Sequence, residues 1–258
     1  GIAARDTLSG IEALRGGAGD DTLAGDAAAN ALSGGDGDDR LDGRDGDDLL
    51  EGGAGADLLD GGDGQDTASY AGTGEGVAVD LATGEGTAGE AAGDTLSGIE
   101  HLIGGWSADT LAGDAGANAL LGGDGDDVLE GRAGADLLDG GWGNDIARYA
   151  GDTVGILADL AAGTVSGGEA EGDTILRIEG IEGGSGNDTL LGNDEANTLA
   201  GGAGDDFIVG GAGWGDSLSG GEGRDTVSYA GSAEAVTISM GAYGFVWVQG
   251  GDAWGDTL

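Results

Sequence analysis

GGAGDDTLA GDAAANALS GGDGDDRLD GRDGDDLLE GGAGADLLD GGDGQDTAS, residues 16–69, is a run of six nine-residue units laid end to end. Each unit opens with a hexad rich in Gly and Asp and closes with a triplet whose middle residue is Leu or Ala. The sixth position is acidic or an amide in every unit, as in Asp21, Asn30 and Asp39. A fixed period with glycine and acid at set offsets is typical of a repeat architecture, in which successive units stack on one another.

Two further arrays follow the same pattern. Residues 104–148 hold five units, and residues 183–228 hold five more, of which the fourth is lengthened to ten residues at Trp214-Gly215. The arrays start at Gly16, Gly104 and Gly183, and the two separations differ by nine residues, which is the additional unit of the first array. This agreement supports the division into units.

Spacers of 34 residues, 70–103 and 149–182, separate the arrays, and a third spacer, 229–258, is cut short by the end of the sequence. Residues 1–15 read as the end of another spacer, so we expect the chain to be a fragment of a longer protein. Each spacer opens with Tyr-Ala-Gly, and we expect these tyrosines (Tyr70, Tyr149 and Tyr229) to cap the apolar ladder of the preceding array.

Each spacer also contains an alternating segment that predicts a half-buried strand: residues 77–81, 156–160 and 236–240. A lead-in strand of the type DTLSGIE then precedes each array, beginning at Asp6, Asp94 and Asp173. Because 34 residues are close to two coils of 18, we interpret the spacers as wider coils of the same stack. The alternative is that they fold into small hairpin caps separating three short rolls.

The composition indicates that this chain can fold only if a source of positive charge offsets its many acidic residues. The 258 residues include 64 Gly and no Pro, only 4% are aromatic, and the net charge is −42. A chain so acidic and so poor in large apolar residues would by default be disordered. The strict period favours order, provided that divalent cations cancel the charge.

The same composition excludes several classes of partner. All eight basic residues are Arg and are scattered, which argues against binding to nucleic acid or to an anionic membrane surface. No apolar run approaches the length of a membrane span. The absence of Cys excludes disulfides and thiolate sites, and it fits a protein that crosses a secretion channel unfolded.

The repeat predicts an all-β fold. No 3.6-residue periodicity occurs, and the density of glycine would destabilise a helix. The closing triplet fits a three-residue strand, and the hexad fits a turn because its glycines permit positive φ. Two units then make one coil with strands on opposite walls, and stacked coils bury Leu against Leu.

In such a coil the sixth position of each unit lies above that of the unit two positions on. Candidate stacked pairs are Asp21 with Asp39, Asp39 with Asp57, Asp48 with Asp66, Asp109 with Asp127, Asp127 with Asp145, Asp188 with Asp206, and Asp206 with Asp225. Stacked like charges repel unless a cation lies between them. Calcium fits because it accepts many oxygen ligands in irregular geometry, whereas magnesium demands tighter geometry and zinc prefers Cys and His.

The units GGAGDDTLA, GGDGDDRLD, GGAGADLLD and GGSGNDTLL resemble the nonapeptide GGxGxDxUx of RTX (hemolysin-type) calcium-binding repeat proteins. The resemblance implies a right-handed parallel β-roll or β-helix solenoid of stacked coils that binds several Ca²⁺ ions in its turns. It further implies type I secretion from a Gram-negative bacterium and folding on extracellular calcium. Carried over by position, the metal ligands are Asp21, Asp39, Asp48, Asp57, Asp66, Asp109, Asp127, Asp136, Asp145, Asp188, Asp206, Asp216 and Asp225.

Two departures from the pattern affect these sites. The second unit of every array carries Asn at the sixth position (Asn30, Asn118 and Asn197), so we expect weaker or empty sites there, with a calcium-free turn closed by amide hydrogen bonds as the alternative. The insertion at Trp214-Gly215 shifts Asp216 by one residue and puts its role as a ligand in question.

We therefore expect a calcium-binding structural module, monomeric, extracellular or at the cell surface, without catalysis of its own. His101 is the only histidine, so neither a Ser-His-Asp triad nor a His metal cluster can form. The alternatives are a polysaccharide-binding or adhesive module, suggested by Trp106 and Trp142 at turn tips, and the accessory repeat region of a secreted enzyme such as an epimerase, protease or lipase.

Overall fold

The structure is a computed structural model and describes residues 9–240, 246–249, 251–253 and 255–257. Its contacts divide the chain into an N-terminal body, residues 1–70 and 77–103, and a C-terminal body, residues 71–76 and 104–258. Each body is described by itself. The start of the lead-in strand predicted from Asp6 lies outside the described residues.

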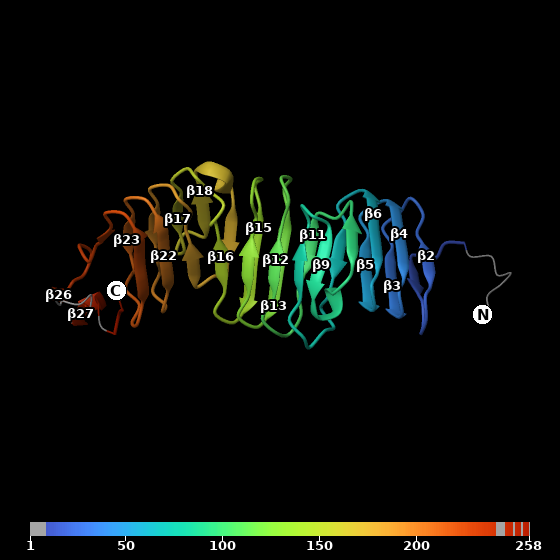
Figure 1. Cartoon of the computed structure of the whole chain (residues 1–258), viewed down its shortest axis with the longest axis horizontal. Helices are drawn as coiled ribbons and strands as arrows, with labels where there is room; N and C mark the ends of the chain where they lie inside the picture. The colour runs from blue at the N-terminus through green and yellow to red at the C-terminus, as the bar shows by residue number, and fades with distance from the viewer. Residues whose placement is uncertain (1–8, 241–245, 250, 254, 258) are drawn as a thin grey trace. The chain divides into compact units, whose positions relative to one another are not determined.

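The N-terminal body is a β-solenoid whose short strands alternate between two walls (Figure 1). One wall has the order β1 (Ala13–Arg15), β3 (Ala31–Asp36), β5 (Leu49–Ala54), β7 (Thr67–Ser69) and β11 (His101–Ile103). The other has the order β2 (Thr22–Ala24), β4 (Arg40–Asp45), β6 (Leu58–Asp63), β10 (Thr95–Ser97), β9 (Glu85–Ala88) and β8 (Ala78–Asp80). The lone histidine, His101, therefore lies in a spacer strand.

The C-terminal body repeats this arrangement. One wall has the order β13 (Ala119–Asp124), β15 (Leu137–Trp142), β19 (Thr174–Leu176), β18 (Thr164–Ser166), β17 (Leu157–Asp159), β21 (Thr189–Leu191), β23 (Phe207–Val209) and β25 (Thr226–Val227). The other has the order β12 (Thr110–Ala112), β14 (Val128–Glu130), β16 (Ile146–Arg148), β20 (Gly180–Glu182), β22 (Thr198–Ala203) and β24 (Ser217–Glu222). A separate antiparallel hairpin joins β26 (Thr237–Met240) to β27 (Val246–Gln249).

The register of the array strands follows the sequence period. Leu32 pairs with Leu50 and Leu41 with Leu59, each in parallel and at a step of 18 residues, which is two units. After the insertion in the third array the step becomes 19, as in the pairing of Leu199 with Leu218. The additional residue is thus absorbed within the turn, and the strands keep their pairing.

A narrow apolar ladder runs between the two walls of each body. The middle residues of the triplets are almost fully buried, with exposed fractions of 0–1% for Leu32, Leu41, Leu50, Leu59, Leu111, Leu120, Leu129, Leu138, Leu190 and Leu199. Each triplet presents one side chain inward and two outward, because successive residues of a strand point to opposite faces. The stacked coils and the predicted Leu ladder are confirmed, and no described residue forms an α-helix.

The spacers are more elaborate than a wide coil. In the first spacer β8 pairs antiparallel with β9, and β9 pairs antiparallel with β10, which returns to a parallel pairing with β6. The second spacer builds the same meander from β17, β18 and β19, between β15 and β21 in one sheet. The second spacer thus stays within the stack, as the preferred interpretation proposed, but contains the hairpin of the alternative.

Within the described residues each spacer also contains one 3₁₀ turn: η1 (Gly89–Ala91), η2 (Gly168–Ala170) and η3 (Gly251–Ala253). Among the described residues, no helix has the length and apolar character needed to cross a membrane.

Candidate metal-binding turns

The sixth-position residues form ladders along the turns of each body. From the third unit of each array onward, the Oδ1 atom of the acid accepts a hydrogen bond from the backbone N–H of the sixth-position residue two units earlier. The bond from Asp39 to Asp57 is 2.7 Å long, and that from Asp127 to Asp145 is 2.8 Å. We call each sixth-position residue with its turn a rung. This bond fixes the orientation of the carboxylates that accept it.

The structure therefore brings together the pairs predicted from the 18-residue step. Backbone-to-carboxylate bonds join Asp21 to Asp39, Asp39 to Asp57, Asp48 to Asp66, Asp109 to Asp127, Asp127 to Asp145, Asp188 to Asp206, and Asp206 to Asp225. Asp216 keeps its place despite the insertion, because its Oδ1 accepts the N–H of Asn197 at 2.9 Å. It is also buried, so the insertion does not remove it from the ladder.

The second carboxylate oxygen divides the predicted ligands into groups. In nine aspartates Oδ2 is buried and has no hydrogen-bond donor among the described residues; we call these the open rungs. They are Asp39, Asp48, Asp57, Asp66, Asp127, Asp136, Asp145, Asp206 and Asp216. A buried carboxylate oxygen without a partner carries a large desolvation cost, so each open rung calls for a cation or a proton.

The first glycine of the unit makes room for the carboxylate. A Cβ atom on Gly122 would lie 2.1 Å from Oδ2 of Asp127 and 2.6 Å from the carbonyl oxygen of Gly140. On Gly34 the corresponding distances are 2.2 Å to Asp39 and 2.6 Å to Gly52. A carboxylate oxygen of one unit and a backbone carbonyl of the unit two positions on therefore converge over a residue without a side chain.

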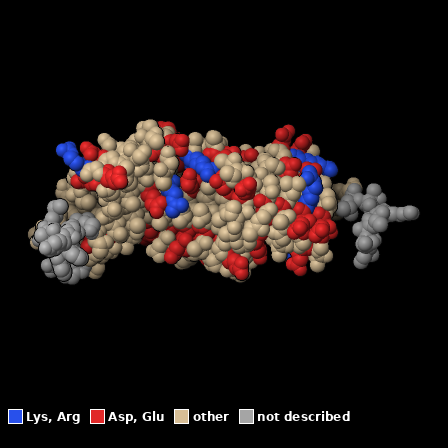
Figure 2. All heavy atoms as spheres, in the orientation of Figure 1, with Lys and Arg blue, Asp and Glu red and all other residues tan. Residues whose placement is uncertain are grey.

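The electrostatics of the open rungs favour a bound cation. Burial raises the pKa of Asp127 to about 7, and the carboxylates of Asp109 and Asp145 add to the shift. Burial likewise raises the pKa of Asp66, Asp145 and Asp216 to about 6. Acidic side chains are also spread over the visible surface, where only a few Arg interrupt them (Figure 2). The negative field of the chain therefore adds to the local cost of each buried charge.

The first rung of each array is closed. Oδ2 of Asp109 accepts the backbone N–H of Gly105 at 2.6 Å, and Oδ2 of Asp188 accepts that of Gly184 at 3.0 Å. Asp21 receives the same bond from Gly17 at 2.8 Å. In each of these three predicted ligands Oδ2 thus has a backbone donor, and in Asp188 Oδ1 also accepts the N–H of Ile156 at 2.9 Å.

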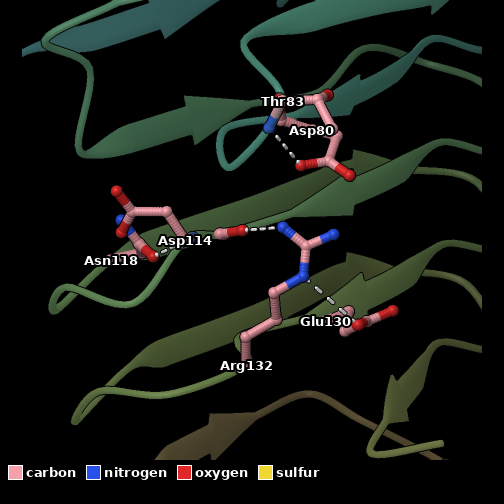
Figure 3. A network of polar contacts seen from close by, with 7 residues as sticks. Asp80, Thr83, Asp114, Asn118, Glu130 and Arg132 are labelled. Atoms are coloured by element: carbon pink, nitrogen blue, oxygen red, sulfur yellow. Dashed lines mark hydrogen bonds and ion pairs between the residues drawn. The ribbon is translucent and has the colours of Figure 1, made fainter. Parts of the chain in front are cut away.

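The second rung of each array, which carries Asn, is closed in the same way. Oδ1 of Asn118 accepts the N–H of Asp114 at 2.8 Å (Figure 3). Oδ1 of Asp114 in turn accepts the N–H of Gly116 at 2.7 Å. Asn30 and Asn197 make equivalent bonds to residues 26 and 193. This geometry matches the alternative of a turn closed by amide hydrogen bonds.

An arginine adds a positive charge beside this turn. Nη1 of Arg132 donates to the carbonyl oxygen of Gly113 at 2.5 Å, and its Nε lies 3.5 Å from Glu130 (Figure 3). Arg132 has φ +68° and stands where the corresponding Gly123 and Gly141 have φ +112° and +102°. An L residue in this region is strained, so the guanidinium contact accompanies a backbone conformation that normally requires glycine.

The last predicted ligand, Asp225, differs from the rest. Its Oδ1 accepts the N–H of Asp206 at 3.1 Å, but its side chain is exposed.

Reasoning from the repeat missed the acids that continue the ladders into the spacers. Asp57 and Asp66 donate through their backbone N–H groups to Asp94 and Glu100, each at 2.9 Å. Asp136 and Asp145 donate to Asp173 and Glu179 in the same way, again at 2.9 Å. The signal available in the sequence was the lead-in motif DTLSGIE, which places an Asp and a Glu at fixed offsets before each array.

Among the described residues, no group of three or more His, Cys, Asp or Glu side chains converges on one point. A cation in these turns would therefore be held by few carboxylates together with backbone carbonyls. Calcium accepts that kind of donor set, whereas zinc sites are built mainly from Cys and His side chains.

Comparison with known families agrees with this geometry. The model of the RTX calcium-binding nonapeptide repeat matches residues 6–41, 33–68, 95–120, 113–147, 182–213 and 215–231, which is more than half of the chain. The chain belongs to this RTX repeat family. A comparison with curated proteins finds no match.

The RTX repeat and the structure fit each other at the level of atoms. The acid of the RTX hexad is the residue whose Oδ2 is orphaned in the open rungs, and its first glycine is the residue over which that oxygen and a carbonyl converge. All six matched segments contain at least one nonapeptide turn.

Proposed function

We propose that this chain is a calcium-responsive structural module that folds into its β-roll on extracellular calcium. The observation that carries the proposal is the set of nine buried Oδ2 atoms without a donor, repeated in phase along the turns. Calcium, when bound, supplies positive charge and six to eight coordination positions for oxygen.

Three features of each turn would together hold the ion. The open-rung aspartates supply the Oδ2 atoms, and the backbone N–H bonds to Oδ1 hold each carboxylate in one orientation. The first glycine of the unit leaves the space in which Oδ2 meets a carbonyl oxygen. Because none of these sites exists in the unfolded chain, the binding free energy becomes folding free energy.

We further propose that the module belongs to a secreted or cell-surface protein of a Gram-negative bacterium, exported by a type I system, and that it is monomeric and without catalysis of its own. Membership of the RTX family supports secretion, and the absence of Cys is compatible with export of an unfolded chain. A net charge of −42 would keep the chain expanded until calcium is met.

The test is far-ultraviolet circular dichroism of the full chain at neutral pH in EDTA, in millimolar magnesium and in millimolar calcium. We expect a disordered spectrum in EDTA and in magnesium, and a strand spectrum in calcium. A strand spectrum that is the same in all three conditions would contradict the proposal.

A second candidate function is the binding of a polysaccharide through exposed tryptophans. Trp106 and Trp142 are 64% and 81% exposed. They occupy the third position in units one and five of the second array, and Asp124 has the same position in unit three. Asp124 is the strand partner of Trp142, and its backbone N–H donates to the carbonyl oxygen of Gly105, the residue before Trp106. Exposed aromatic faces aligned along one edge could stack on sugar rings.

The double variant Trp106→Ala/Trp142→Ala tests this candidate on a glycan array, with Trp214→Ala as the control. Trp214 is also exposed, at 74%, but lies in the insertion of the third array. Loss of glycan binding only in the double variant would support the candidate. Absence of any glycan signal for the unaltered chain would contradict it.

A further inference from the structure

Each spacer carries a hexad that resembles the array hexad but folds differently. The three copies are GEAAGD at 89–94, GEAEGD at 168–173 and GDAWGD at 251–256. All three begin with the 3₁₀ turns η1, η2 and η3, which array turns lack. Ala91, Ala170 and Ala253 are each 0% exposed. A methyl group therefore occupies the interior of each of these turns.

The final Asp of each spacer hexad continues a ladder of array rungs. Its Oδ1 accepts the backbone N–H of the preceding aspartate of that ladder. The bond is 2.9 Å from Asp57 to Asp94, 2.9 Å from Asp136 to Asp173 and 3.0 Å from Asp216 to Asp256. In this respect the spacer acid is equivalent to an open-rung aspartate.

Its second oxygen is not. The hydroxyl of Tyr70 donates to Oδ2 of Asp94 at 3.0 Å. Tyr149 donates to Asp173 at 3.2 Å, and Tyr229 donates to Asp256 at 2.8 Å. This is the oxygen that has no donor in the open rungs, and in all three spacers the donor is the tyrosine that opens the spacer.

The tyrosines are suited to this role. Tyr70 and Tyr149 are each 3% exposed, so their hydroxyls are shielded from competing water. Burial and the adjacent carboxylate raise the pKa of both phenols far above the ordinary value, which keeps the hydroxyl proton available. A cation at a spacer rung would have to displace a buried aromatic side chain.

We propose that the tyrosine hydroxyl replaces the calcium ion at Asp94, Asp173 and Asp256, so that each of these aspartates is a calcium-free step that ends one of the two ion rows of the preceding array. The proposal rests on the proposed function and refines it, because it assigns which buried aspartates of the ladders take an ion. It also gives the opening tyrosine a polar role in addition to any packing on the Leu ladder.

The sharpest test uses two aspartates that stack directly on one another. Asp136 and Asp173 are each 2% exposed and are joined by the bond from the N–H of Asp136 to Oδ1 of Asp173. The variants Asp136→Asn and Asp173→Asn of the full chain are titrated with calcium by calorimetry, beside the unaltered chain. We expect Asp136→Asn to bind one ion fewer, because an open rung loses its charged ligand.

Asp173→Asn is expected to bind as many ions as the unaltered chain. An asparagine there can still accept the N–H of Asp136 through Oδ1, and its amide can donate to the hydroxyl of Tyr149. A loss of one ion in Asp173→Asn, equal to that in Asp136→Asn, would overturn the proposal. Failure of the unaltered chain to bind calcium would instead contradict the proposed function.

A second measurement addresses the tyrosine itself. Tyr149→Phe removes only the hydroxyl, and we expect it to lower the melting temperature in saturating calcium by a few degrees without reducing the number of bound ions. The added change Asp173→Asn should restore part of the loss, because the group left without a donor is then neutral. Effects of the two changes that simply add, or an unchanged melting temperature in Tyr149→Phe, would overturn the proposal.

Discussion

Asp136 and Asp173 are adjacent steps of one ladder in the C-terminal body, and the hydrogen-bond partner of Oδ2 differs between them. Both side chains are 2% exposed, and burial raises the pKa of both. Each is the last residue of a hexad, GRAGAD at 131–136 and GEAEGD at 168–173. Oδ2 of Asp173 accepts the hydroxyl of Tyr149, whereas Oδ2 of Asp136 accepts nothing among the described residues. On the proposal made above, the neighbour of the second oxygen, and not the acid alone, decides which rung takes an ion.

The same distinction separates the start of an array from its later part. Asp109 and Asn118 are closed by backbone donors in the first coil of the second array, whereas Asp127, Asp136 and Asp145 are open in the coils that follow. In a closed rung a backbone N–H of the same turn donates to the side-chain oxygen. Open rungs leave a buried negative charge that the chain does not neutralise.

The largest effect is expected from filling the space of an open rung. Gly122→Ala would place a Cβ 2.1 Å from Oδ2 of Asp127 and 2.6 Å from the carbonyl oxygen of Gly140. We expect a loss of about 3 kcal/mol of unfolding free energy in calcium, because backbone and carboxylate must both move. Thermal or denaturant unfolding measures it. Gly151→Ala is the control, since a Cβ there meets nothing within 4 Å. Equal stabilities of the two variants would break the link between the glycine and the site.

A smaller effect is expected from removing one charge of an open rung. Asp127→Asn should raise the calcium concentration at the folding midpoint roughly tenfold, equivalent to about 1.4 kcal/mol. The control is Asp126→Asn, because Asp126 is exposed and uses only one oxygen, which accepts the N–H of Asn144 at 2.9 Å and which asparagine retains. Circular dichroism during calcium titration gives both midpoints. A midpoint shifted as far by Asp126→Asn would mean that general charge, and not the rung, governs folding.

The pH dependence follows from the raised pKa values of four open rungs. Asp127 has a pKa of about 7, and Asp66, Asp145 and Asp216 have values of about 6, all above the ordinary value for Asp. A raised folded-state pKa contributes stability that is present at low pH and is lost as pH rises through the folded pKa. The calcium-free roll should therefore gain stability as pH falls from 7.5 towards 5.

Protons should also compete with calcium over the same interval, so the calcium midpoint should rise as pH falls. Melting in EDTA and calcium titrations across the pH series measure the two trends. A calcium-free chain that becomes less stable on acidification over this range would contradict the assignment of the open rungs.

The smallest effect is expected at a closed rung. Asn118→Asp should change the unfolding free energy in calcium by no more than about 1 kcal/mol and should leave the number of bound ions unchanged. The new carboxylate can accept the N–H of residue 114 as Asp109 accepts that of Gly105. Calorimetry counts the ions. One additional ion in Asn118→Asp would show that the identity of the sixth residue, and not the closure of the turn, decides binding.

The sequence alone was sufficient for what repeats. The nine-residue period predicted the 18-residue register, the Leu ladder through Leu32 and Leu50, and the stacking of Asp39 on Asp57, because stacked coils must place equal positions above one another. It also predicted that the turns with Asn at the sixth position differ from those with Asp, and in the structure these turns are closed by backbone N–H bonds to the Asn oxygen.

The parts that were not predicted depend on contacts between unlike segments. The bond from Tyr149 to Asp173 spans 24 residues of a spacer, and the meander β17–β18–β19 replaces what the residue count suggested was a plain coil. The closure of Asp109 by Gly105 was not visible either, since the hexad at 104–109 has the same acid as the open hexads. These differences depend on which donor lies within hydrogen-bond distance of an oxygen. The identity of the residues in the hexad does not predict that distance.

The most direct test is the thermal unfolding of the unaltered chain at neutral pH in EDTA and at a series of calcium concentrations. If the open rungs are completed by calcium, no cooperative transition occurs in EDTA, and the melting temperature rises steadily with the free calcium concentration. A melting curve in EDTA that is superimposable on the curve in calcium would contradict the central claim.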